Sequence, residues 1–356
     1  MLNFRRLLRS NSVKAALLLL LSVALVSCET VGYYSQAARG QLTIVFGRED
    51  IQRLIERQDL SDELADKFAR VMDIREFAES ELGLPVGGNY SSYVDIEREH
   101  VVWNVFAAPE FSVEPVNWCY PIAGCVAYRG YFSERSALRY AAKLEEDGLD
   151  VYTGGVDAYS TLGWFEDSLL STVLNRADYQ LAGLIFHELA HQLVYLPGDT
   201  TFNESFATAV EREGVRRWLA KSNKDSNIAA ALLDYDRQQQ FVDLVTDYRD
   251  RFESLYQLDL NASSMRSQKL ELQQMLREEY ATLKQQWQGY EGYDGWFSRS
   301  LNNAQLSTVA SYNDLLPFFV AVFEQSNQDF SAFYAEVSRL ANLPEQERDE
   351  LVAALE

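Results

Sequence analysis

The strongest constraint on the fold comes from residues 186–191, Phe-His-Glu-Leu-Ala-His, which hold two of the chain's three histidines. Residues four positions apart share one face of an α-helix, so His187 and His191 can reach one metal ion if this segment is helical. Glu188 then lies beside the open coordination position, where it can accept a proton. Apolar neighbours would bury the helix: Leu184, Ile185, Leu189 and Leu193. The segment predicts a helix with two metal ligands and a general base.

The residues that follow this helix decide between classes of metal site. A metzincin has Gly at position 194 and His at position 197, and this chain has Val194 and Pro197 instead, which excludes that class. A gluzincin takes its third ligand from a Glu on the next helix, and Asn203-Glu204 resembles the Asn-Glu-x-x-Ala segment of that class. We expect Asn203 to be the N-cap of the second helix, with Glu204 in its first turn. The alternative is a pair of structural helices with two hydrogen-bonded histidines.

The ligand set determines the expected chemistry. Two histidines, one carboxylate and an exchangeable water are typical of a catalytic zinc site, and we expect one zinc ion per chain held by His187, His191 and Glu204. Zinc lowers the pKa of a bound water toward about 7, and Glu188 is the expected acceptor of its proton. A hydroxyl or imidazole must then stabilise the negative charge on the attacked carbonyl. Tyr159 and Tyr312 are the expected donors, and His100 is a further candidate unless it is an ordinary strand residue.

The N-terminus has the features of an export signal. Its basic residues precede an apolar run from Ala15 to Val26, which predicts a signal peptide over residues 1–27. This run of twelve residues is shorter than the roughly 20 that a membrane-spanning helix needs. The run ends in Leu-Val-Ser-Cys, which resembles the bacterial lipobox, so Cys28 is the expected site of lipidation and residues 28–47 the expected tether. A free or buried Cys28 after ordinary cleavage is the alternative.

This signal predicts a protein anchored by lipid on the periplasmic side of the bacterial cell envelope. Glu29 follows the cysteine, and by resemblance a lipoprotein without Asp at this position is sorted to the outer membrane. An exported chain meets oxidising conditions, so Cys119 and Cys125 most simply form a disulfide. A pair of metal ligands is the alternative, although five residues between two cysteines exceed the usual zinc spacing.

The charge of the chain excludes one large class of partner. There are 32 basic and 53 acidic residues, which gives a net charge of −21. Nucleic-acid binding requires a basic surface for the phosphates, so no nucleic-acid partner is expected. The acidity is typical of a solvated surface, and the alternative is a site that gathers cationic peptides.

The remaining pattern predicts an α+β protein that is mostly helical. Residues 48–224 should form a small mixed sheet with the zinc-site helices, and residues 225–356 a helical part, together one peptidase domain over 48–356. We expect helices to begin at Ser61 and Ser133, and strands over the ranges 101–106, 125–132 and 151–154. Residues 198–316 lack proline and predict long helices, with a coiled coil as the alternative. Further helices are expected over 312–356, with Pro317 near a start and Pro344 between two of them.

The whole chain resembles a bacterial family of predicted aminopeptidases, zinc lipoproteins whose HExxH motif places them with the gluzincins. The resemblance covers the lipobox and several later segments: 33–37, 118–132, 154–165, 186–207, 302–304 and Tyr312. It implies a zincin-like core and zinc-dependent removal of N-terminal residues from a peptide substrate.

The resemblance also directs attention to residues 154–165. Gly154 and Gly155 would let an extended substrate pair with an edge strand above the zinc helix, and a tight turn is the alternative. An aminopeptidase must hold a free ammonium, and Asp157, Glu166 and Asp167 are the nearby carboxylates, of which Asp157 is our expected substrate-binding residue. Two other functions stay open: a zinc endopeptidase that acts on envelope proteins, and a non-catalytic scaffold lipoprotein that works through its long helices.

Overall fold

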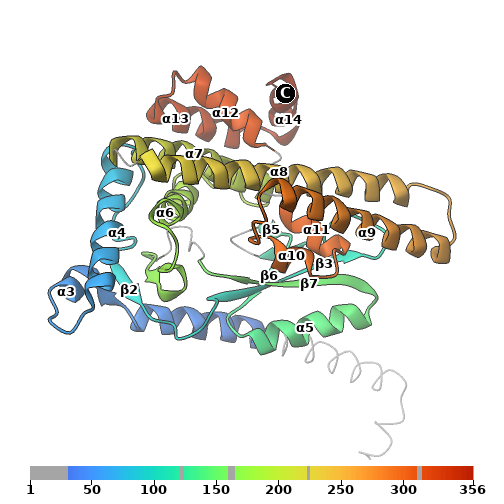
Figure 1. Cartoon of the computed structure of the whole chain (residues 1–356), viewed down its shortest axis with the longest axis horizontal. Helices are drawn as coiled ribbons and strands as arrows, with labels where there is room; N and C mark the ends of the chain where they lie inside the picture. The colour runs from blue at the N-terminus through green and yellow to red at the C-terminus, as the bar shows by residue number, and fades with distance from the viewer. Residues whose placement is uncertain (1–30, 121–123, 159–164, 223–224, 311–314, 356) are drawn as a thin grey trace, which may run out of the picture.

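A computed structural model of the chain describes residues 31–120, 124–158, 165–222, 225–310 and 315–355 (Figure 1). Helices predominate in these ranges, together with three small sheets, which confirms the predicted mostly helical α+β class. The predicted signal peptide, the lipidation site Cys28 and the two candidate donors Tyr159 and Tyr312 lie outside the described residues. No helix within the described ranges has the length and apolar character needed to cross a membrane.

The central sheet is antiparallel and has the strand order β6-β3-β7, with β6 at Arg129–Tyr131, β3 at Val102–Pro109 and β7 at Leu149–Val156. Helix α5 (Glu134–Glu146) covers one face of this sheet and α11 (Asn303–Ala310) the other (Figure 1). The strands expected over 101–106 and 151–154 are confirmed.

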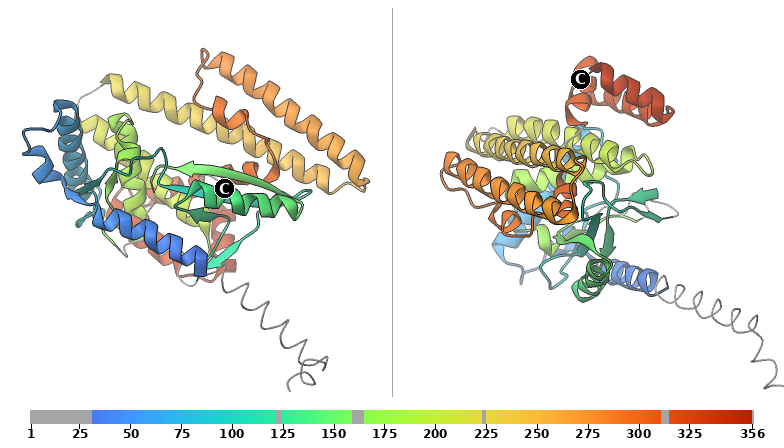
Figure 2. Two further views of the ribbon diagram at one scale, coloured as in Figure 1. Left: turned by 90° about the horizontal axis from the view of Figure 1, so that it is seen from below. Right: turned by 90° about the vertical axis from the view of Figure 1, so that its right-hand side faces the viewer.

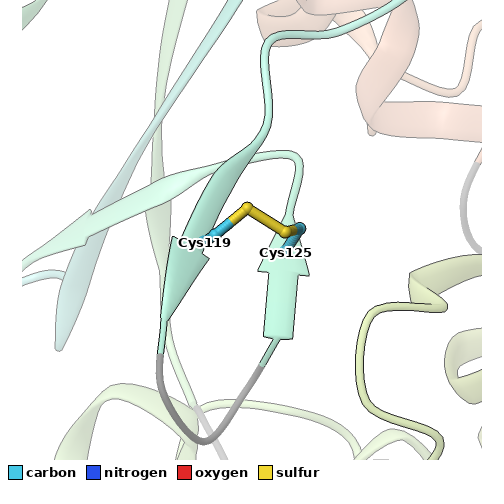
Figure 3. The surroundings of a disulfide bond; sticks show 2 residues. All are labelled: Cys119 and Cys125. Carbon is cyan, nitrogen blue, oxygen red and sulfur yellow. A yellow bond between two sulfur atoms is a disulfide. The ribbon is translucent and has the colours of Figure 1, made fainter.

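The strand expected over 125–132 is interrupted in the structure. Residues Gly124–Val126 form β5, which leaves the central sheet and pairs with β4 (Trp118–Tyr120) as a separate hairpin. Ala127 and Tyr128 connect β5 to β6. Cys119 and Cys125 lie opposite each other in the hairpin and are joined by a disulfide (Figure 3).

A second small sheet is mixed. Its strands are β1 (Glu49–Asp50), β2 (Ser92–Val94) and β8 (Leu169–Leu170), where β1 and β2 are antiparallel and β2 and β8 are parallel. The short helix α3 (Ile51–Ile55) follows β1 directly, and β8 runs into a single 3-10 turn at Ser171–Val173. This sheet closes the side of the molecule next to α4 (Asp62–Ser80).

Local signals set the starts of the predicted helices. The Ser61 hydroxyl caps α4 by accepting a hydrogen bond from the Leu64 N–H at 3.3 Å, and Ser133 caps α5 in the same way. Both helices therefore begin where the sequence predicts. Two acidic residues in the first turn of α4 further favour its N-terminus.

The main hydrophobic core is helical. It lies between α4, α6 (Asp178–Leu193), α7 (Thr200–Ser222), α12 (Leu316–Gln325) and α13 (Phe330–Ala341), and its largest buried side chains are Phe68, Phe186, Phe202, Phe206, Phe318, Phe319 and Phe333. Helices α12 and α13 come late in the chain yet cover the outer side of α7, with α14 (Glu345–Leu355) beside them (Figures 1 and 2).

A second core holds the long helices. Helices α8 (Asp225–Tyr256) and α9 (Ala262–Gln286) pack side by side, and the short α10 (Asp294–Phe297) and α11 close this layer. Its buried residues include Tyr248, Phe252, Leu276, Tyr280, Trp287 and Phe297. Because α11 contacts α8 as well as the central sheet, the helical layer is continuous with the sheet rather than a separate coiled coil.

Residues 31–46, which fall in the predicted tether, are helical and pack beneath the central sheet beside α5 (Figures 1 and 2). The Gln36 side-chain oxygen accepts a hydrogen bond from the Phe132 N–H at 2.9 Å, and Ile44 is buried. The Tyr33 ring lies against the rings of Tyr120 and Tyr131. The segment is therefore part of the folded body from residue 31 onward.

Candidate metal centre

Helix α6 carries the two histidines and Glu188. Its start is anchored by Asp178, whose carboxylate accepts a hydrogen bond from Lys67 at 3.1 Å and forms an ion pair with Arg70 at 3.2 Å, both on α4. One face of α6 is buried in the main core by Ile185, Phe186 and Leu189, and another face lines a cavity through Gln180, Leu184, His187, Glu188 and His191. The three- and four-residue spacing of the HExxH segment thus brings its polar side chains onto the cavity wall.

The loop between α6 and α7 reverses the chain, so that Glu204, the third candidate ligand, lies near the two histidines. The residue that caps α7 differs from the prediction. Helix α7 begins at Thr200, and the residue that caps it is Asp199, whose Oδ1 accepts from the Phe202 N–H at 2.9 Å. Asn203 lies inside the first turn, so the predicted N-cap is wrong. Its amide instead clamps the loop through two hydrogen bonds to the Leu196 backbone, at 2.7 and 2.8 Å. This clamp fixes the turn of α7 from which Glu204 projects.

The side chains of His187, His191 and Glu204 converge. The Nε2 atoms of the two histidines lie 3.1 and 3.6 Å from the same Glu204 oxygen, and the three possible ligand atoms lie within 4.8 Å of one another. Zinc bonds of about 2.0–2.2 Å in a tetrahedral arrangement separate ligand atoms by roughly 3.3–3.6 Å. The donor set and its spacing therefore fit one metal ion, and these three residues could hold it.

The protonation of this group follows from its burial and its partners. Burial alone would lower the pKa of His187, but hydrogen bonds to Glu204 and Glu211 outweigh it and raise that pKa well above its ordinary value. Burial would raise the pKa of Glu204, and the hydrogen bonds from both imidazoles lower it instead. Glu204 is therefore an ionised carboxylate, as a metal ligand must be.

A second carboxylate, which the sequence analysis missed, supports His187 from behind. Glu211 Oε2 lies 3.1 Å from His187 Nδ1, on the side of the ring opposite Glu204. Glu211 follows Glu204 by seven residues, so both side chains project from one face of α7, and this spacing is the signal that could have found it. Gly183 on α6 leaves room for it, because a Cβ there would lie 3.2 Å from the Glu211 carboxylate. Glu211 thus holds the imidazole with Nε2 directed at the metal position.

Replacing this supporting carboxylate should weaken metal binding without abolishing it. We expect Glu211→Ala to lower zinc affinity about 10- to 100-fold, since His187 loses the partner that orients its ring. Competition with a chromophoric chelator measures this affinity. Glu213→Ala is the matched control, because Glu213 lies on the same helix but pairs with Arg216 and Arg217. Equal affinities for the Glu211 variant and the wild type would contradict the assigned role.

Glu188 lies between the two histidines on α6 and lines the same cavity. Burial raises the pKa of this carboxyl, while the neighbouring imidazoles partly offset the effect. Within the described ranges no hydrogen bond engages its carboxylate, and the residue lines the cavity.

The cavity has a volume of about 850 Å³ and lies between the central sheet and the helical layer. Its floor comes from the hairpin, β6 and the end of β7, and its roof from α6, α7 and α8. Tyr33 and Ala37 of the 31–46 helix close one side, and Tyr290 and Tyr293 from the segment before α10 close another. Segments from across the chain thus form one chamber that contains the candidate metal ligands.

Only one of the three residues predicted to bind substrate is in the described lining of this cavity. Asp157 lines it, whereas Gly154 and Gly155 pair with β3 inside β7 and are absent from its described lining. Gly155 lies against the His100 ring, where a Cβ would be only 2.0 Å from the imidazole. The role of the two glycines in substrate binding stays a prediction.

The candidate ammonium acceptors are already engaged. The Asp157 carboxylate lies 2.7 Å from His100 Nδ1 and 3.1 Å from Arg176 Nη2, which balances its charge. Asp167 is buried behind the site, where it accepts from the Gln192 side chain at 3.1 Å. Neither Asp167 nor Glu166 is among the described residues that line the cavity.

Two other tyrosines approach the metal position. Tyr128 and Tyr195 line the cavity; burial raises the pKa of each, and the nearby Glu204 carboxylate raises it further. Both phenols are therefore protonated hydrogen-bond donors. Tyr195 follows His191 by four residues, a helical spacing that could have drawn attention to it. His100, bound to Asp157, is not part of the described lining.

Comparison with known proteins gives one match. The model of a family described as "Putative aminopeptidase" matches residues 32–352. No curated protein and no solved structure matches the chain. The matched range contains all the candidate ligands, Glu188 and the whole lining of the cavity.

Proposed function

The chain belongs to this aminopeptidase family, because the family model covers nearly its whole length, and from this premise we propose that it is a zinc-dependent aminopeptidase. The observation that carries the proposal is the convergence of the His187, His191 and Glu204 ligand atoms beside Glu188 in one cavity. A helix with HExxH, followed by a helix with a ligand Glu and lying above a small sheet, also supports a zincin-like core of the gluzincin type.

Each part of the site has a task in this proposal. Bound zinc would supply an acidified water and polarise the peptide carbonyl. Glu188 accepts the proton of the attacking water and then delivers it to the leaving amine. We assign to Tyr128 and Tyr195, which line the cavity, the donation of hydrogen bonds to the negative charge that develops on the carbonyl oxygen. Glu211 keeps His187 oriented throughout.

Removal and return of the metal tests the zinc requirement. We expect dialysis of the full-length protein in detergent against a strong chelator to abolish turnover of aminoacyl-fluorophore substrates, and one equivalent of zinc to restore it. N-acetylated versions of the same substrates should not be cleaved, since an aminopeptidase requires a free ammonium. Full turnover by metal-free protein would contradict the zinc dependence. Cleavage of internally quenched peptides alone would assign an endopeptidase instead.

We also propose that acylated Cys28 anchors the protein to the periplasmic face of the bacterial outer membrane. The motif at residues 25–28 supports this, and the folded body includes residue 31, only three residues after Cys28. The side of the cavity that Tyr33 and Ala37 line would then lie close to the membrane surface. Cells fed an alkyne-tagged fatty acid should label the wild type and not a Cys28→Ala variant; equal labelling of both would exclude Cys28 as the attachment site.

A further inference from the structure

One end of the cavity has no part in the proposed reaction. It is formed by the start of α6, by α8 and by the segment before α10, and its lining residues are Tyr179, Asp234, Tyr235, Tyr290 and Tyr293. These residues share the chamber with His187 and Glu188. A substrate bound at the metal position can therefore extend to this end.

Asp234 is the carboxylate of this end, and its position is fixed by hydrogen bonds. Its Oδ2 accepts from the Tyr179 hydroxyl and from the Gln180 amide, the latter at 3.3 Å. Arg237 on α8 lies 3.5 Å from Oδ1, outside the described lining, and compensates part of the charge. The side chain stays 27% exposed, so the carboxylate is held in place and still accessible from the cavity.

The tyrosines surround this carboxylate with aromatic rings. The Tyr179 hydroxyl donates to Asp234, and Tyr235 is the next residue along α8. Burial raises the pKa of Tyr179, Tyr235 and Tyr293; Asp234 raises that of Tyr179 and Tyr293 further, and Glu211 mainly that of Tyr235, so all three are neutral phenols. Neutral aromatic faces attract cations. Arginines already stack on two rings of the group from outside the lining, Arg237 on Tyr290 at 4.2 Å and Arg212 on Tyr235 at 5.5 Å.

The charge balance of the cavity favours a cationic ligand at this end. Its described lining holds five carboxylates, those of Asp157, Glu188, Glu204, Glu211 and Asp234. Arg176 is the sole Lys or Arg in that lining, and it is paired with Asp157. A zinc ion would offset two of the three negative charges of Glu188, Glu204 and Glu211 around His187. Asp234 is then the carboxylate that a cation entering the far end would meet.

The distance from the metal position sets the size of such a ligand. Gln180, which contacts Asp234, precedes His187 by seven residues, or about 10 Å along α6 at 1.5 Å per residue. An extended peptide advances about 3.3 Å per residue, so about three residues, or one residue with a long side chain, span this distance.

We propose that Asp234 and the surrounding tyrosines form a subsite for the cationic group of a peptide substrate. This cationic group is an ammonium or guanidinium. It comes either from a Lys or Arg side chain beside the cleaved bond or from the N-terminus of a longer peptide. The inference rests on the proposed function, since it takes the metal position as the point of cleavage.

Kinetic selectivity tests the subsite. The full-length protein, Asp234→Asn and the control Asp236→Asn are compared on Lys-, Arg- and Leu-fluorophore substrates. Asp236 lies on α8 two residues away, is exposed and bonds to Gln240. A hydrogen bond to a charged group contributes about 1.5–3 kcal/mol, so Asp234→Asn should lower the Lys-to-Leu ratio of kcat/KM at least about tenfold, mainly through KM. An unchanged ratio would exclude a Lys or Arg side chain as the source of the cation and leave the N-terminal ammonium, which the binding measurement tests.

A binding measurement separates this inference from the proposed function. Calorimetry with a Glu188→Gln background uses two peptides, Lys-Ala-Ala and Leu-Ala-Ala, each with a free and an acetylated N-terminus. If the Lys peptides bind more tightly than the Leu peptides, and Asp234→Asn weakens their binding at least about tenfold, the Lys side chain is the group that the subsite binds. If instead the peptides with a free N-terminus bind more tightly than the acetylated ones, with the same loss in Asp234→Asn, the subsite binds the N-terminal ammonium. Binding unaffected by Asp234→Asn overturns the subsite. If binding depends on Asp234 but the wild type cleaves nothing, the subsite stands and the proposed function falls.

Discussion

Glu188→Gln is expected to lower kcat on aminoacyl-fluorophore substrates by about 10²- to 10⁴-fold while the protein still binds one zinc ion. Glutamine has the shape of glutamate but cannot accept the proton of the attacking water. Glu188 lies between the two histidines on the cavity wall, and burial raises its pKa, which suits a group that must take up a proton and release it again. Kinetics and elemental analysis of the same preparation measure both quantities.

The control for this variant is Glu213→Gln, on the neighbouring helix and outside the cavity, which should retain both activity and zinc. A Glu188 variant with more than about a tenth of the wild-type kcat would show that another group is the base. If the variant loses its zinc, Glu188 contributes to metal binding and the assignment of ligands needs revision.

The second large effect is expected from Glu204→Ala, which removes one of the three candidate ligands. The zinc content should fall to near zero at a zinc concentration that saturates the wild type, because two histidines alone make a poor catalytic site. A catalytic metal ion stabilises the charge of the transition state by several kcal/mol, and each 1.4 kcal/mol of activation free energy is about a factor of ten in rate. Turnover should therefore fall at least about a thousandfold. The buried faces of α6 and α7 do not involve this side chain, and circular dichroism should show an intact fold.

Glu211→Ala separates this effect from a general disturbance of α7. Both residues contact His187, but Glu204 faces the metal position and Glu211 faces away from it. The Glu211 variant should therefore bind zinc more weakly and still reach full occupancy at high zinc. A Glu204 variant with one tightly bound zinc would contradict its assignment as a ligand.

Features encoded by short-range patterns could be predicted from the sequence. The helical state of residues 186–191 follows from apolar neighbours and two histidines four residues apart, and the starts of α4 and α5 follow from Ser61 and Ser133, whose hydroxyls satisfy free backbone N–H groups. Each signal acts within about one helical turn, so no knowledge of the tertiary structure is needed.

Other local features had two outcomes that fitted the sequence equally well, either two possible capping residues or two possible strand pairings. Asp199 and Asn203 are both good capping residues, and Asp199 caps α7 while the Asn203 amide bonds to Leu196. The run 125–132 has strand composition throughout, but Cys125 is joined to Cys119, and Gly124–Val126 pairs with β4 rather than with the central sheet. In both cases a contact made elsewhere in the fold determined the outcome.

The cavity could be predicted least, because its wall comes from segments far apart in the chain. Tyr33, Tyr128, Asp234 and Tyr290 contribute to it from four such segments, and none lies in a motif with the metal ligands. Their convergence depends on how α8 and the 31–46 helix pack around the sheet. The expected donors Tyr159 and Tyr312 lie outside the described residues and stay predictions.

The most direct test of the central claim is X-ray diffraction from crystals of the purified protein at energies above and below the zinc absorption edge. We expect one anomalous peak per chain, present only above the edge and bonded to His187 Nε2, His191 Nε2 and the Glu204 carboxylate. A protein that hydrolyses peptides yet shows no zinc peak at this position, or binds its zinc elsewhere, would contradict the proposed zinc site.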